Sequence, residues 1–226
     1  MTRISVVLPF RTEGIEGLDF RPLPTGRFRV GLFDYPWKFS AGVKGRPQHY
    51  HRMTDDEIAA SNPLRILHPD GAWLLIWCTG PKAQTMFRLV EYWQAVHGRR
   101  IKYSTRVQGW MKLIASHPGL DVAPIFSRDI HHGMGLVAMK NLEDLWAFKV
   151  GPARLQKRGE QELLIAPRRE YSRKPDESYV RLRRMFRGPC VEVFARQPRE
   201  GWSVWGDESG KFEGINYVAL ADDAAA

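Results

Sequence analysis

The sequence has little that would cross-link or anchor the chain. It contains 226 residues and two cysteines, Cys78 and Cys190, and both cysteines lie inside apolar runs. We therefore expect buried thiols and a reducing, cytoplasmic setting rather than a disulfide. No apolar run approaches the roughly 20 residues of a membrane-spanning helix. The apolar start at residues 3–10 is short and no small-residue cleavage site follows it, so we expect neither a membrane segment nor a signal peptide.

Internal repeats and low-complexity tracts are also missing from the sequence. Hydrophobic residues make up 43% of the chain and charged residues 26%, which suits one folded domain with a sizeable core. Residues 1–26 are rich in proline and glycine, which predicts an irregular lead-in. We expect the domain itself to span residues 27–218 and the tail at 219–226 to fray.

Positive charge is abundant, and it is clustered. The formal net charge is +9, and basic residues gather in four runs, at 44–52, 154–158, 167–174 and 181–187. A single run of this kind is more often a solvated face than a binding site. Four such runs in one chain favour a polyanionic partner, nucleic acid above all. A membrane surface is a weaker alternative, because no segment pairs a clean apolar face with a basic one.

Apolar and polar patterns predict strands that alternate with helices. Alternation of this kind is typical of an α/β sandwich with a mainly parallel sheet, and such sheets bind ligands at the carboxyl ends of their strands. Asp34 and Arg196 both lie just past the end of an expected strand. The pattern is least regular at residues 112–142, and long loops are usually functional or disordered. We expect strands at 27–33, 72–78, 103–111, 145–150, 162–166 and 190–195, and helices at 54–61, 81–98 and 175–186.

The first expected strand ends in a chemically distinctive corner, Asp34-Tyr35-Pro36-Trp37. The exocyclic amine of an adenine is a poor nucleophile, because its lone pair is delocalised into the ring. Two acceptors would free that lone pair, namely the Asp34 carboxylate and the Tyr35 carbonyl, whose direction Pro36 restricts. Trp37 offers a face on which the base can stack. Turns of this composition are also common on protein surfaces, so the corner alone leaves an ordinary strand-to-loop turn open.

This corner is one of six blocks that follow one another along the chain. The blocks are "DYPWKF", "YHRMTDDEI", "GAWLLIWCTG", "SRKPDESY", "VEVFARQPREGW" and "WGDE", and they fall within residues 27–210. In content and order they resemble the MTA-seventy family of adenine amino-methyltransferases, which includes the catalytic subunit of the eukaryotic mRNA adenosine methyltransferase and many bacterial and phage relatives. The resemblance implies a Rossmann-like fold and S-adenosylmethionine (SAM) as the methyl donor. It also implies a permuted order, in which the catalytic corner precedes the donor-binding blocks.

The resemblance further implies roles for individual residues. Lys174 falls on a lysine that meets the donor's carboxylate, and Arg196 falls on an arginine near the donor's ribose. Tyr50 falls where a side chain lies over the target base. The catalytic set is Asp34, Tyr35, Pro36 and Trp37. The donor-binding set is Asp34, Lys174, Phe194, Arg196, Asp207 and Glu208, with Phe194 also a candidate core residue. The substrate-binding set is Tyr50, Lys44, Arg46, His49, His51 and Arg173.

Two positions depart from the family's pattern. The family usually has proline where this chain has Tyr35, and the tyrosine keeps the backbone carbonyl but removes one rigid element of the turn. Asp207 stands where asparagine is usual, and its carboxylate can still accept hydrogen bonds from ribose hydroxyls. Like the family, the chain has no clear glycine-rich donor loop, because "GMG" at 133–135 lacks a strand–turn–helix context.

Several functional alternatives stay open on the sequence alone. The leading hypothesis is methylation of the adenine amine in DNA, since the chain is compact and carries no recognisable RNA-binding appendage, as is typical of bacterial and phage members. The same reaction on RNA and a catalytically silent nucleic-acid-binding subunit are the alternatives, and either a homodimer or a heterodimer is possible. We expect no metal site, because the histidine pairs at 49/51 and 131/132 lack acidic or thiolate companions at ligand spacing. Trp202 and Trp205 are expected to flank a turn near the donor site.

Overall fold

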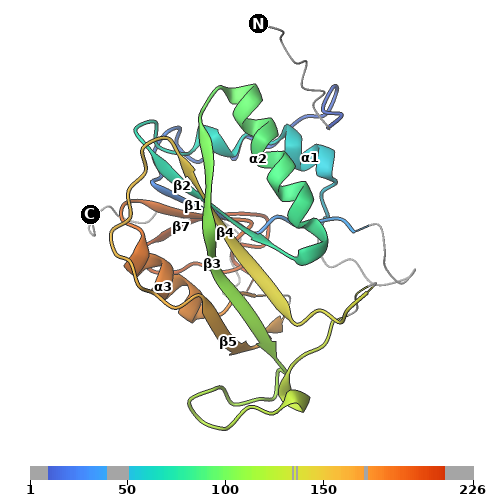
Figure 1. Ribbon diagram of the computed structural model, residues 1–226. Helices are drawn as coiled ribbons and strands as arrows, with labels where there is room; N and C mark the ends of the chain where they lie inside the picture. Colours follow the sequence, from blue (N-terminus) through green and yellow to red (C-terminus); the bar gives the residue numbers. More distant parts are fainter. Residues whose placement is uncertain (1–9, 40–50, 134, 136, 171–172, 212–226) are drawn as a thin grey trace, which may run out of the picture.

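The computed structural model describes residues 10–39, 51–133, 135, 137–170 and 173–211. Within these residues, seven strands form one sheet in the order β5-β3-β4-β2-β1-β6-β7 (Figure 1). The strands are β1 (Val30–Phe33), β2 (Ala72–Cys78), β3 (Ile101–Leu113), β4 (Leu142–Val150), β5 (Leu163–Pro167), β6 (Cys190–Val193) and β7 (Trp202–Trp205). The main helices are α1 (Asp55–Ala60), α2 (Ala83–His97) and α3 (Asp176–Met185).

All strands of this sheet except β4 run in one direction. β1 pairs in parallel with β2 and β6, β6 with β7, and β3 with β5. β4 is antiparallel to both of its neighbours, β2 and β3. The reversal follows from the connection, because the chain leaves β3 and enters β4 at the same end of the sheet without crossing it. The predicted α/β sandwich with a mainly parallel sheet is therefore confirmed.

Helices cover both faces of the sheet, and each covered face has its own core. Side chains of α1 and α2 pack with alternate residues of β2 in one buried cluster, which includes Leu74, Ile76 and Trp93. Side chains of α3 pack with the other set of β2 residues, which includes Trp73 and Trp77. β2 is buried along its whole length, which is why its sequence reads as one continuous apolar run.

The helix ends follow the sequence signals closely. Thr54 and Glu57 form the reciprocal capping box that starts α1. α2 ends at Gly98, which has φ 66° and donates its N–H to the Gln94 carbonyl, as expected of a helix-stopping glycine. Pro81 lies in a short 3-10 turn, η2 (Gly80–Lys82), before α2 rather than in its first turn. Among the described residues, no helix has both the length and the apolar character needed to cross a membrane.

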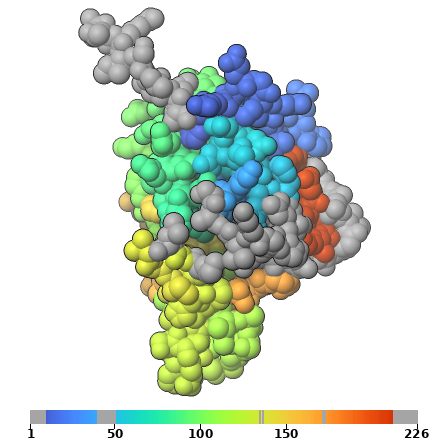
Figure 2. Space-filling view, turned by 90° about the vertical axis from the view of Figure 1, so that its right-hand side faces the viewer, coloured from blue at the N-terminus to red at the C-terminus, as the bar shows by residue number. Residues whose placement is uncertain are grey.

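Three predictions need adjustment. Trp202 and Trp205 do not flank a turn but form the two ends of β7, a short edge strand bounded by Gly201 and Gly206. β3 is longer than expected, and residues 114–130, which follow it, project away from the body of the domain (Figures 1 and 2). Residues 10–26 contain no helix or strand, as expected. They nevertheless pack on the domain, with the Phe10 ring edge-on to Tyr92.

Both cysteines are buried free thiols, as the sequence predicts. Cys78 ends β2 and Cys190 begins β6, so they lie at opposite ends of the sheet. Burial raises the pKa of each thiol above its ordinary value. Both side chains are therefore unreactive packing groups at neutral pH.

Candidate active site

The Asp34-Tyr35-Pro36-Trp37 corner is held by backbone hydrogen bonds on both sides. The Asp34 N–H donates to the Val193 carbonyl over 3.3 Å, which ties the corner to the end of β6. Across Pro36, the Trp37 N–H donates to the Tyr35 carbonyl over 2.8 Å. That carbonyl keeps a second lone pair, so it can still serve as the acceptor that the sequence suggests. The chain therefore leaves β1 through a tight turn whose direction is fixed.

A pocket of about 370 Å³ opens at the carboxyl ends of β1, β6 and β7. This is where the sheet topology predicts a ligand. Among the described residues, five carboxylates line it against one arginine and one histidine, so this lining is acidic although the whole chain is basic. The lining residues are Glu16, Leu18, Asp34, Pro36, His51, Met53, Glu57, Phe194, Ala195, Arg196, Trp205, Asp207 and Glu208.

The floor of the pocket is a close approach of two loops. Phe194, directly after β6, has φ 64°, a left-handed conformation that is rare for a residue other than glycine. Gly206, directly after β7, has φ 150°, and a Cβ there would lie 3.0 Å from the Phe194 Cα. The Ala195 N–H donates to the Trp205 carbonyl and joins the two loops. Backbone strain of this kind gathers at functional sites, where the surroundings enforce it.

Asp34 is the outer end of a chain of alternating charges. Its Oδ2 lies 2.7 Å from the Lys174 Nζ, and the same Nζ lies 3.0 Å from the Glu143 Oε1. The other Glu143 oxygen lies 2.6 Å from the Lys112 Nζ. The Lys174 side chain is 3% exposed and the Glu143 side chain 9%, so both central members of this charge chain are out of water.

The pKa values show that these buried groups stay charged. Burial alone would raise the pKa of Glu143, but Lys174 and Lys112 outweigh it and lower the pKa to about 2. Burial alone would lower the pKa of Lys174, but Asp34 and Glu143 raise it. The ammonium of Lys174 therefore stays protonated beside Asp34 throughout the physiological range.

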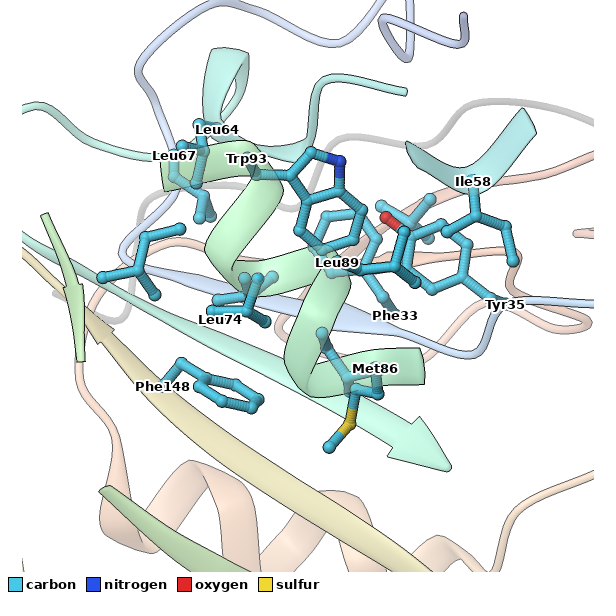
Figure 3. Packing of buried hydrophobic residues seen from close by; sticks show 14 of the residues in the cluster. Phe33, Tyr35, Ile58, Leu64, Leu67, Leu74, Met86, Leu89, Trp93 and Phe148 are labelled. Atoms are coloured by element: carbon cyan, nitrogen blue, oxygen red, sulfur yellow. The ribbon is translucent and has the colours of Figure 1, made fainter. Parts of the chain in front are cut away.

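Tyr35 is held in place by the packing of its side chain, because it lacks the rigid ring of the proline that is usual at this position. Its side chain is 2% exposed and its ring lies 5.5 Å from Phe33, 6.0 Å from Trp93 and 5.2 Å from Phe194, measured between ring centroids. Figure 3 shows Tyr35 beside α2 in this buried cluster. Burial raises the pKa of Tyr35 far above its ordinary range, so the phenol does not ionise. The aromatic core therefore supplies the rigidity that the turn loses when tyrosine replaces proline.

Trp37 lies in the same core rather than in the pocket lining. Its side chain is 7% exposed and its indole N–H donates to the Trp77 carbonyl over 3.3 Å. The Lys82 ammonium lies 5.9 Å from the centroid of its ring. These contacts fix the indole firmly, and its use as a stacking face stays a prediction.

The structure brings most of the predicted site residues to one place. Asp34, Pro36, His51, Phe194, Arg196, Asp207 and Glu208 all line the pocket. Lys174 donates a hydrogen bond to Asp34 but is not among the residues that line the pocket. Its contact with the carboxylate of the methyl donor stays a prediction. Arg173 instead pairs with Glu170 and donates to the Gln197 side chain. The other predicted substrate residues, Lys44, Arg46, His49 and Tyr50, lie outside the described residues.

Other residues of the site were missed by sequence reasoning. Glu16 and Leu18 come from the segment that we expected only to lead into the domain. Glu57 lines the pocket while it also caps α1, and the hydrogen bonds from Thr54 lower its pKa. Glu143 gave the clearest available signal, an acid at the start of the alternating strand pattern "LEDLWAFKV". Its partners come from distant parts of the chain, so only the fold shows that it contacts Lys174.

The basic runs are less open than their sequence suggests. Several of their arginines are paired with acids along and around α3, namely Arg169 with Asp176, Arg181 with Glu177 and Arg184 with Glu160. Other cations gather beside the carboxyl end of β3, near Lys112. The His131 ring lies 3.4 Å from the Arg168 guanidinium, and burial together with Arg168 and Lys112 lowers the His131 pKa. Positive charge therefore flanks the acidic pocket on its β3 side.

Comparisons with known proteins agree with the motifs. A model of the MT-A70 family matches residues 28–208. A curated relative from Oryza sativa subsp. japonica, described as "Probable N(6)-adenosine-methyltransferase MT-A70-like", is 25% identical over 221 residues. That match covers 91% of this chain and 25% of the relative, so the chain spans about a quarter of the relative's length.

Two solved structures show a distant similarity of fold. M1.HpyAVI has a TM-score of 0.41 and 10% identity, over 74% of this chain and 69% of its own. TTHA0409 from Thermus thermophilus, described as a "Putative DNA Modification Methylase" and solved with SAM, has a TM-score of 0.37 and 12% identity, over 78% of this chain and 77% of its own. Neither score is high enough to carry a functional argument. The family match, in contrast, includes the corner, the charge chain and the pocket floor: the chain belongs to the MT-A70 family, and the resemblance seen in its motifs is confirmed.

Proposed function

We propose that this protein is a SAM-dependent methyltransferase that acts on the exocyclic N6 amine of adenine in nucleic acid, with DNA as the substrate. The observation that carries the proposal is the Asp34 carboxylate, which lies at an acidic pocket and is held by a buried, protonated Lys174. The family membership of the chain and the name of the rice relative support the same reaction.

The pocket fits the chemistry of SAM. SAM carries a sulfonium and an ammonium against one carboxylate, so its net charge is positive, and a pocket lined by five carboxylates attracts it. Asp207 and Glu208 offer acceptors for ribose hydroxyls, and Phe194 with Leu18 offers apolar surface for the adenine ring. An acidic lining would repel a phosphate backbone, so nucleic acid must contact the basic rim and insert only a base. When bound, SAM supplies an electrophilic methyl group on its sulfonium sulfur.

Asp34 is placed to act on the target amine. A carboxylate that accepts a hydrogen bond from the amine draws its lone pair out of conjugation with the ring, and the Tyr35 carbonyl is the second acceptor. The nitrogen loses one proton as it gains the methyl group. The proton acceptor is the Asp34 carboxylate, which belongs to the corner and lines the pocket. Lys174 holds the Asp34 carboxylate in one orientation through a 2.7 Å contact.

The target base has to leave its stack to reach this corner, as in other enzymes that modify bases. Arg168 is exposed at the carboxyl end of the sheet, on the β3 side of the pocket, and offers positive charge for the flanking phosphates. RNA is the second candidate, because the rice relative is named as an adenosine methyltransferase.

Nucleoside mass spectrometry tests the proposal. The protein and SAM are incubated in parallel with duplex DNA, single-stranded DNA and RNA, and Asp34→Ala is the control. We expect N6-methyldeoxyadenosine from DNA that disappears with the variant. Methylated adenosine from RNA alone would move the proposal to the second candidate. No methylated base in any tube, from a protein that binds SAM and nucleic acid, would contradict the proposed activity and favour a silent subunit.

A further inference from the structure

A second hollow lies away from the proposed active site. It has a volume of about 450 Å³. Four cationic side chains line it together with one hydroxyl and one indole, and none of the described lining residues is acidic. The residues that matter are Trp73, Ser104, Lys149, Arg154, Lys157 and Arg158.

This hollow, which we call the amino-end pocket, is separated from the active site by the sheet itself. Trp73 lies near the start of β2. Asp34 directly follows β1, whose last residue, Phe33, pairs with Ile76 near the end of β2. At about 3.3 Å per residue, the two levels differ by roughly 13 Å along the strands. Trp73 also belongs to the core on the α3 face, whereas Tyr35 and Trp37 belong to the core on the α2 face. The two pockets therefore lie at opposite ends and on opposite faces of the sheet.

The part of the chain that the structure describes supplies no acidic partner for the cations of the amino-end pocket. Among the described residues, none of Lys149, Arg154, Lys157 and Arg158 takes part in an ion pair. Arg181 and Arg184 of nearby α3, in contrast, pair with Glu177 and Glu160. Lys149 also stands directly opposite Lys102 in the β3–β4 register, and like charges at such positions destabilise a sheet. A bound anion would relieve this repulsion.

The wall of the pocket is built rather than loose. Arg154, Lys157 and Arg158 lie in the segment that leaves β4 and runs past α3 toward β5 (Figure 1). The Trp73 indole N–H donates to the Arg154 carbonyl over 3.0 Å. The Gln156 N–H donates to the Met185 carbonyl at the end of α3 over 2.9 Å. Both bonds fix the segment at its start and middle, so the cationic side chains converge on one hollow.

We propose that the amino-end pocket is a phosphate-binding site that takes the backbone of a single-stranded nucleic-acid segment far from the target base. This inference rests on the proposed function for the identity of the polyanion. Duplex DNA is stiff on this scale, with a persistence length of about 150 base pairs, whereas a single strand bends around a domain freely. A charged groove that tracks a flexible backbone is the usual basis of sequence-independent single-strand binding.

Salt-dependent binding tests the proposal without relying on methyl transfer. Fluorescence anisotropy measures the affinity of the protein for single-stranded DNA of about 40 nucleotides and of about 5 nucleotides, the latter spanning roughly 17 Å at duplex spacing. The test variant is Arg154→Gln with Arg158→Gln. The matched control is Arg88→Gln, an exposed arginine of α2 on the other face of the sheet. Thermal melting confirms that each variant is folded.

For the long strand, we expect the double variant to lose at least about 10-fold in affinity at 0.1 M salt. The slope of log K against log salt should become shallower by about 1.4, since each lost phosphate contact removes about 0.7. The control should show neither change. A loss for the short strand as well would mean that the pocket binds backbone phosphates by itself, which also supports the proposal. An unchanged slope for the long strand, or an equal change in the control, would overturn it.

A free phosphate compound is the other source of the same chemistry, and tripolyphosphate is the probe for it. Competition by tripolyphosphate against the long strand, lost in the double variant, would support a shared phosphate site. If the double variant weakened tripolyphosphate binding but left the long strand unaffected, the nucleic-acid assignment would be wrong. Because every readout is binding, a protein without methyl transfer would still give a clear answer on this pocket.

Discussion

Glu143 is the residue whose removal should reveal most about the buried charge chain. Its carboxylate bridges Lys174 at 3.0 Å and Lys112 at 2.6 Å, and its side chain is 9% exposed. Glu143→Gln keeps the shape of the side chain but removes the negative charge between Lys174 and Lys112. Breaking a buried ion pair from one side costs about 3–5 kcal/mol. Because Asp34 still pairs with Lys174 and Lys112 is partly exposed, we expect a loss near the lower end, about 3 kcal/mol of the free energy of unfolding.

Urea unfolding measures this loss. With a slope near 2 kcal/mol per molar, a loss of about 3 kcal/mol lowers the midpoint by roughly 1.5 M. Glu162→Gln is the control, because Glu162 pairs with Arg106 at the surface with its side chain 50% exposed, and exposed pairs contribute at most about 1 kcal/mol. Lys174→Met and the double variant Glu143→Gln with Lys174→Met complete a double-mutant cycle, in which the double variant should lose less than the sum of the two single losses. A loss below about 1 kcal/mol for Glu143→Gln, or additive single and double losses, would refute the account of a coupled buried network.

Three further predictions follow from the pKa values and the packing. The Glu143 pKa falls from its ordinary 4.5 to about 2 on folding, so the contribution of this carboxylate to the free energy of unfolding is complete above pH 4.5 and is lost as the pH falls toward 2. In urea titrations, wild type should therefore lose more stability between pH 4.5 and pH 2 than Glu143→Gln. Gly206→Ala should lower the melting temperature and weaken SAM binding, because its Cβ would press on the Phe194 backbone at 3.0 Å; normal SAM affinity in calorimetry would contradict this. In urea unfolding, Tyr35→Ala should lower the free energy of unfolding by about 3–5 kcal/mol, because it removes the packed ring, and Tyr35→Phe should lower it by less than about 1 kcal/mol. Equal losses for the two variants would show that the hydroxyl, not the packing, anchors the corner.

The sequence was most informative where local chemistry decides the structure. The capping box at Thr54, the stop at Gly98 and the apolar run of β2 are each specified by neighbouring residues, and the structure has them where expected. The corner at Asp34 and the acidic pair Asp207 and Glu208 were found through motifs, and the fold brings them to one pocket.

The rest depends on contacts that no local pattern contains. Glu143 and Lys174 are far apart in the chain, and only the reversal of β4 brings the start of that strand beside Asp34. The basic runs misled partly for the same reason, because Arg184 meets Glu160 only through the packing of α3, whereas Arg181 pairs with Glu177 within α3 itself. β7 was read as a turn because four residues between two glycines are too few to show an alternation.

The central claim is that Asp34 acts on the amine during methyl transfer, and one measurement tests it most directly. Labelled methyl transfer to nucleic acid is compared between wild type and Asp34→Asn, with SAM affinity measured in parallel. Asparagine can still accept a hydrogen bond from Lys174, so the variant should stay folded. Its SAM affinity should lie within about threefold of the wild-type value. Loss of the negative acceptor should lower the transfer rate by about 10²- to 10³-fold. Transfer that persists, or that falls only in proportion to SAM affinity, would contradict a catalytic role for this carboxylate.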